Sequence, residues 1–146
     1  MPKAEIKGFN FARVDTVAAS NRGAECELVD ADGKATGVFF KVLGSDSDVW
    51  RSHINERANK QVQAKFKAQR GAGRPADIPN VEDAKRDGVL LLTMCTVGWR
   101  DGDKPTITWG DEELPFSPAN AERVYTELPF IYSQIDEFIG DMGNFI

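Results

Sequence analysis

The chain has 146 residues, of which 41% are hydrophobic, 28% charged and 10% aromatic. This length favours one domain, and the composition excludes a disordered chain and a fibrous repeat. Apolar runs stay well below the roughly 18 residues of a membrane span, and the N-terminus lacks the apolar segment of a secretory signal. We therefore expect a cytoplasmic protein, in which Cys26 and Cys95 are reduced and buried.

The net charge of -5 conceals an uneven distribution along the chain. Residues 51–74 contain seven Lys or Arg and one acidic residue, whereas residues 75–146 contain five and fourteen. A short basic segment thus precedes an acidic half. The function of the basic segment has to be explained.

The first half of the chain predicts an arm, a hairpin and a helix. Phe9 and Phe11 alternate as in a strand, so residues 1–24 are expected to form an arm or edge strand. Asp32-Gly33 predicts the turn of a β-hairpin over residues 25–43. A serine cap and nearby aspartates predict a long basic helix over residues 46–70.

The second half predicts a linker at residues 71–79 and a helical body over residues 80–146. Its first helix is expected to run from Asn80 to near Gly98, and the segment from Trp99 to Trp109 to form a loop or short hairpin. Ser117-Pro118 predicts a short helix to about Leu128, and Pro129 begins the last helix. The predicted fold is a single α+β domain, mostly α, with an N-terminal β-hairpin, a long basic helix and a C-terminal helical body.

Residues suited to catalysis or metal binding are few. His53 is the only histidine, and the chain has no nucleophile elbow, no closely paired zinc ligands and no P-loop. Asp30 and Asp32 resemble part of an EF-hand loop, but Leu28 and Phe39 occupy its first and last positions. We expect a protein that is not an enzyme and holds no cofactor or metal.

The basic helix has three interpretations. Its apolar residues recur every four positions and form a narrow stripe with Lys and Arg around it. It could bind a protein partner or the acidic half of a second copy, follow a nucleic-acid backbone, or be a solvated surface. The overall acidity of the chain and the small footprint of one helix argue against nucleic acid as the partner.

Aromatic residues are frequent in the C-terminal third, where they could form either a core or an interface. Helical spacing favours the core for most of them. Trp109 and Tyr132 have polar neighbours in the sequence, so we expect these two on the surface.

Two parts of the chain, in this order, resemble the tail assembly chaperones of long-tailed bacteriophages. The first runs from the hairpin, Leu28-Val29-Asp30-Ala31-Asp32-Gly33-Lys34, to Val42-Leu43-Gly44-Ser45-Asp46-Ser47-Asp48 and the charged helix. The second consists of Trp99, Leu114-Pro115-Phe116-Ser117-Pro118-Ala119-Asn120-Ala121, Leu128-Pro129-Phe130-Ile131, Gln134-Ile135, Phe138-Ile139 and Asn144-Phe145-Ile146. The resemblance covers about residues 25–146.

This resemblance implies a non-enzymatic protein of the host cytoplasm that coats the tape measure protein before the tail tube forms around it. Such a chaperone is absent from the mature virion, and a frameshifted form in many relatives also recruits the tail tube protein. The alternative is a structural tail or head-completion component that stays in the particle. The predicted partner-binding residues are Trp50, Ile54, Arg57, Val62, Lys65, Phe66, Trp109 and Tyr132, with an amphipathic helix or a second copy as the partner.

Overall fold

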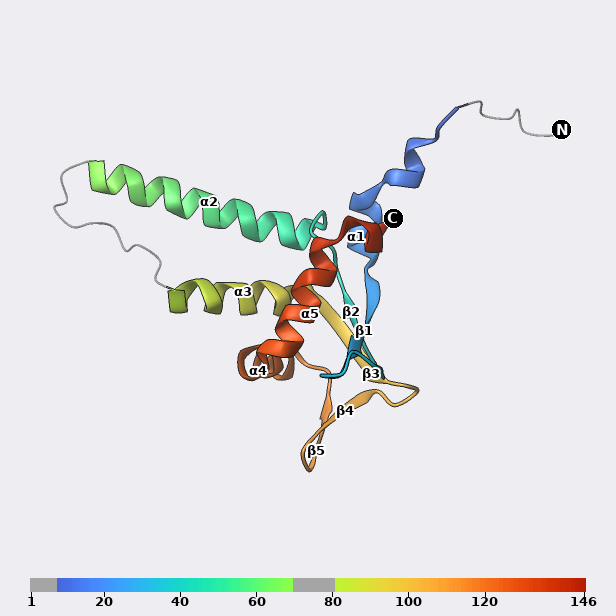
Figure 1. Ribbon diagram of the computed structural model, residues 1–146. Helices are drawn as coiled ribbons and strands as arrows, with labels where there is room; N and C mark the ends of the chain where they lie inside the picture. The colour runs from blue at the N-terminus through green and yellow to red at the C-terminus, as the bar shows by residue number, and fades with distance from the viewer. Residues whose placement is uncertain (1–7, 70–80) are drawn as a thin grey trace.

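A computed structural model describes residues 8–69 and 81–146 of the chain (Figure 1). The predicted linker at residues 71–79 lies outside the described residues. The described part contains five α-helices, a three-stranded sheet and a two-stranded sheet.

A short 3-10 helix, Phe11–Val14, and α1, Thr16–Arg22, precede the first strand. Of the predicted arm or edge strand at residues 1–24, the edge strand is therefore wrong for the described residues before Ala24, which are helical from Phe11 to Val14 and from Thr16 to Arg22. Side-chain caps explain the difference, because Asn10 accepts a hydrogen bond from the Ala12 amide and Asp15 accepts one from the Ala18 amide.

The hairpin consists of β1, Ala24–Val29, and β2, Ala35–Val42, which pair antiparallel. Its turn contains Gly33 at a φ of 80°, and Asp30 Oδ1 accepts hydrogen bonds from the amides of Asp32 and Lys34. The turn chemistry of Asp32-Gly33 therefore operates as the sequence predicts.

A third strand, β3, Thr96–Asp101, pairs with β2 and gives the sheet order β1-β2-β3. It directly follows α3, Val81–Cys95, so the helix ends before the predicted Gly98. The change occurs where the β-branched pair Thr96-Val97 succeeds the apolar helical run, and Trp99 pairs with Phe40 across the sheet. A separate ribbon follows, made of β4, Thr106–Trp109, and β5, Glu112–Pro115.

These elements correct the predicted fold class. A helix precedes the hairpin, so the chain does not begin with a β-hairpin followed by a long helix. Residues 80–146 are not a helical body, because three strands lie between α3 and the next helix. Strand pairing of β3 with β2 joins residues that are far apart in the chain, and local periodicity does not reveal it.

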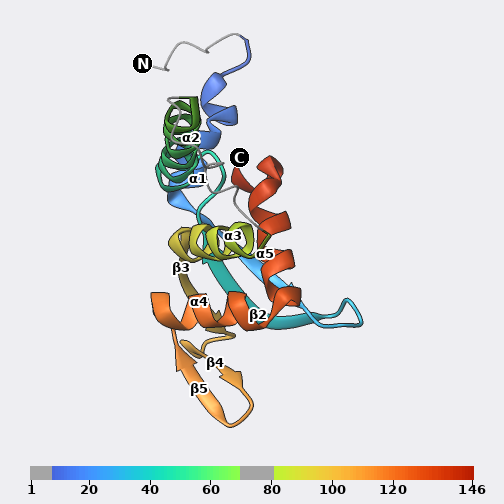
Figure 2. The same ribbon diagram turned by 90° about the vertical axis from the view of Figure 1, so that its left-hand side faces the viewer.

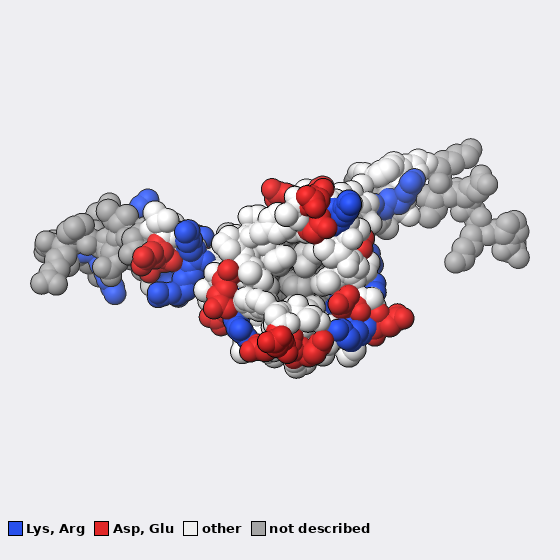
Figure 3. Space-filling model, turned by 60° about the horizontal axis from the view of Figure 1, so that its bottom comes forward, with Lys and Arg blue, Asp and Glu red and all other residues white. Residues whose placement is uncertain are grey.

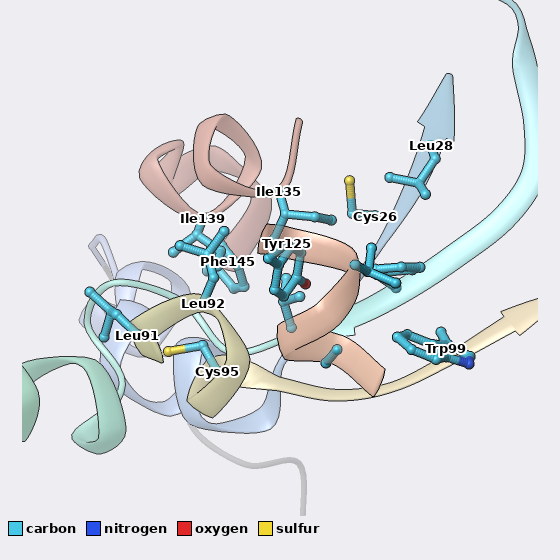
Figure 4. Packing of buried hydrophobic residues seen from close by; sticks show 14 of the residues in the cluster. Cys26, Leu28, Leu91, Leu92, Cys95, Trp99, Tyr125, Ile135, Ile139 and Phe145 are labelled. Carbon is cyan, nitrogen blue, oxygen red and sulfur yellow. The ribbon is translucent and has the colours of Figure 1, made fainter. Parts of the chain in front are cut away.

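The C-terminal helices are α4, Pro118–Glu127, and α5, Pro129–Gly140, followed by a 3-10 helix, Met142–Phe145. Ser117 accepts a hydrogen bond from the Asn120 amide and precedes Pro118, as predicted for the start of α4. With α3 they cover the three-stranded sheet (Figure 2). The core between them includes Phe40, Leu92, Tyr125, Ile135 and Ile139 (Figure 4).

The remaining helix, α2, Asp48–Gln69, lies along α3 and runs in the opposite direction (Figure 1). Its C-terminal half extends away from the sheet. In the described part of the chain, none of the helices is both long enough and apolar enough to cross a membrane.

Candidate protein interface

The N-terminal half of α2 is attached to α3 by polar contacts. His53 is only 9% exposed, and its Nε2 lies 3.0 Å from Asp87 Oδ1 on α3. Arg57 Nη1 lies 3.1 Å from Asp87 Oδ2, as an ion pair without hydrogen-bond geometry. Ser47 is fully buried and caps the helix by accepting a hydrogen bond from the Trp50 amide. The side of α2 that faces α3 therefore contains His53 and Arg57.

The predicted apolar stripe does not follow this attached side. Val62 comes nine residues after His53, and Phe66 comes nine residues after Arg57, which is two and a half turns at about 3.6 residues per turn. Val62 and Phe66 therefore lie on the side of α2 that points away from α3. The exposed fractions of the stripe residues agree with this placement. Trp50 is half-buried, whereas Ile54 is 39%, Val62 51% and Phe66 59% exposed.

Basic side chains surround the exposed end of the stripe. From Arg57 to Lys67 the helix has four Lys or Arg and no acidic residue, and Lys60, Lys65 and Lys67 are all exposed. We define the distal face of α2 as Val62, Lys65 and Phe66. Lys60 and Lys67 come seven and fourteen residues after His53, about two and four turns, so they lie on the attached side of the same basic half of the helix. Exposed apolar side chains on a basic half-helix suit an acidic, amphipathic partner.

Trp109 lies at a different part of the molecule, in a hollow of about 220 Å³ that we call the apolar groove. The Arg123 guanidinium stacks over the indole at 4.5 Å from the ring centroid, and Trp109 is half-buried. The apolar groove is bounded by β1, β2, β4, α4 and α5, and is lined by Leu28, Val29, Thr36, Val38, Phe40, Ile107, Thr108, Trp109, Val124, Leu128 and Ile131.

Tyr132, the other aromatic predicted on the surface, lies in a second hollow of about 550 Å³ between α3, α4 and α5. Its ring is half-buried and its hydroxyl lies over Gly88, where a larger residue would collide with it. Burial raises the pKa of Tyr132, and the charges of Asp136 and Asp87 raise it further. Acidic and basic residues both line this hollow, and its surface is less apolar than the groove at Trp109.

The predicted binding residues thus fall into three places. Ile54, Val62, Lys65 and Phe66 are exposed on α2, whereas Arg57 is already paired with Asp87 and Trp50 is half-buried near the base of the helix. Trp109 and Tyr132 lie in separate hollows. The sequence did not predict the apolar groove, because five elements spread over the chain contribute to it. The alternation of Ile107 and Trp109 in β4 was the local signal for part of its lining.

The described residues contain no group of three His, Cys, Asp or Glu side chains placed to hold a metal ion. Cys26 and Cys95 are buried, and burial raises the pKa of each thiol to about 11. Both are therefore protonated at neutral pH, so neither is an activated nucleophile.

No protein family, curated protein or solved structure matches this chain significantly.

Proposed function

We propose that this protein is a non-enzymatic tail assembly chaperone of a long-tailed phage, and that the distal face of α2 binds the tape measure protein. The observation that carries the proposal is the exposure of Val62 and Phe66 on the side of α2 opposite to its attachment at Asp87. Because the attachment uses His53 and Arg57, the distal face is free to receive a partner without disturbing the fold.

The surface suits a long helical client. An amphipathic helix buries its apolar side chains at spacings of three and four residues, which matches Val62 and Phe66 at four. Lys65 lies beside these two side chains and attracts acidic residues at the edge of such a helix. A contact this small gives weak binding at each site. Weak contacts repeated along a tape measure protein would cover it and still be displaced when the tube assembles.

The proposal is tested by co-expressing the chain with a phage tape measure protein and measuring how much of that protein co-purifies. The variant Val62→Asp/Phe66→Asp should reduce the co-purified amount at least roughly ten-fold, the effect of about 1.4 kcal/mol. A matched control is Val81→Asp, which changes an exposed valine at the start of α3 outside this surface.

Circular dichroism should give the same helix content for all three proteins. Undiminished co-purification with the double variant would contradict the proposal. The alternative, a structural tail or head-completion component, predicts that mass spectrometry finds the chain in purified virions, whereas a chaperone is absent from them.

A further inference from the structure

We propose that the apolar groove of one molecule binds the distal face of α2 of a second molecule, so that copies associate head to tail. The inference goes beyond the proposed function and does not depend on which client α2 binds. It starts from two surfaces on one chain, an apolar groove among acidic elements and a basic helix end with exposed apolar side chains.

The groove lies in the acidic part of the molecule. The segments that bound it, residues 24–42 and 104–141, contain twelve Asp or Glu and four Lys or Arg. Figure 3 views the lower face of the molecule and shows an uncharged, hollowed area with mainly acidic side chains around its edge. Two of the four cations are already paired, Lys104 with Glu113, and Arg123 with Glu112 and Glu127. The other two are Lys41 on β2 and Lys34 in the hairpin turn.

The basic partner for this face is present in the same chain. The half of α2 that carries the distal face has three exposed cations, Lys60, Lys65 and Lys67, and no acidic residue between Arg57 and Lys67. Opposite charges steer the two surfaces together and fix their register. Apolar contact then provides the binding energy, because Phe66 and Val62 would leave water for a lining of aliphatic and aromatic side chains.

The two surfaces cannot meet within one molecule. α2 is a continuous helix whose distal end extends away from the sheet, whereas β4 and β5 lie at the opposite end of the molecule (Figure 1). The occupant of the groove is therefore α2 of another copy. Because the two surfaces differ, each contact leaves one groove and one helix free, and further copies can add to form a ring or a chain.

This association would cover the distal face of α2 until a client arrives. The groove holds about 220 Å³, enough for one or two side chains rather than a large interface. We therefore expect weak association that depends on concentration and falls as added salt screens the charges. A client that binds the distal face would release the monomer.

Sedimentation velocity tests the inference with two single-surface variants. Val62→Asp/Phe66→Asp removes the helix surface. Val29→Lys places a cation at the exposed edge of the groove, and Val97→Lys makes the same change at an exposed position of β3 outside it. Wild type and Val97→Lys should associate to the same extent, and both single-surface variants should sediment as monomers.

An equimolar mixture of the helix variant and the Val29→Lys variant should form a 1:1 complex, because each supplies the surface that the other lacks. Growth should stop at that pair. If circular dichroism shows that Val29→Lys does not fold, Thr108→Lys, an exposed position of the groove lining, replaces it.

Two results would overturn the inference: wild type that stays monomeric at high concentration and low salt, or a groove variant that associates like wild type. Client binding separates this inference from the proposed function. Val29→Lys should keep the tape measure protein bound, whereas Val62→Asp/Phe66→Asp should lose both interactions.

Discussion

Gly44 is the residue at which α1, the hairpin and the C-terminus meet. It donates a backbone hydrogen bond to the Ser20 carbonyl, and a side chain on it would lie 2.8 Å from Ser20 Cβ and 2.9 Å from Phe145 Cγ. Both neighbours are buried, so they cannot move aside cheaply. Absence of a side chain at Gly44 therefore allows three distant segments to close over the core.

We predict that Gly44→Ala lowers the free energy of unfolding by about 1–3 kcal/mol, the usual cost of overpacking a core. The control is Gly140→Ala at the end of α5, where an added methyl group meets no atom within 4 Å. That change should be neutral or stabilising by up to about 1 kcal/mol, because alanine favours a helix. Urea denaturation measures both, and equal stability of Gly44→Ala and wild type would refute the packing argument.

Among the elements, α2 depends on one acidic side chain of α3. Asp87 contacts both His53 and Arg57, so a single carboxylate makes these polar contacts between α2 and α3, while Val49 and Trp50 at the start of α2 pack against the core. Its side chain is 29% exposed, which makes the pair partly shielded from water. The position of the distal face relative to the body thus follows from a contact near the other end of α2.

We predict that Asp87→Ala destabilises the protein by about 1.5–3 kcal/mol, the range for hydrogen bonds to charged groups. Amide hydrogen exchange should accelerate in the first half of α2 and remain unchanged in α5. Glu137→Ala, which removes an exposed carboxylate of α5, serves as the control. Equal exchange of α2 in Asp87→Ala and wild type would show that Asp87 does not hold the helix.

Elements with strong local signals could be predicted from the sequence. The Asp32-Gly33 turn, the Ser117-Pro118 helix start and the basic helix all occur as local chemistry requires. The pairing of strands from distant segments could not be predicted in this way. Thr96–Asp101 becomes a strand because β2 offers an edge to pair with, and only the β-branched Thr96-Val97 pair hints at it. The sequence did not predict α1, because this helix has only seven residues and its start depends on the side-chain cap at Asp15.

At the scale of the whole molecule, the sequence shows the charges and the apolar stripe, but it does not show where they lie on the folded surface. A spacing of four residues drifts by about 40° at each step around a helix. The stripe therefore begins half-buried at Trp50 and ends exposed at Phe66, and only the contact at Asp87 shows which side is free. The apolar groove depends on tertiary structure entirely, since α4, α5 and three strands bring its lining together.

Hydrogen exchange of α2 in the free protein and in its complex with the purified tape measure protein tests the central claim most directly. In the free protein at low concentration, amides of residues 60–67 should exchange rapidly, because the described side chains there are mostly exposed. Binding should slow their exchange and leave α5 unchanged. A complex that forms while exchange at residues 60–67 stays as in the free protein would contradict the claim that the distal face of α2 is the binding surface.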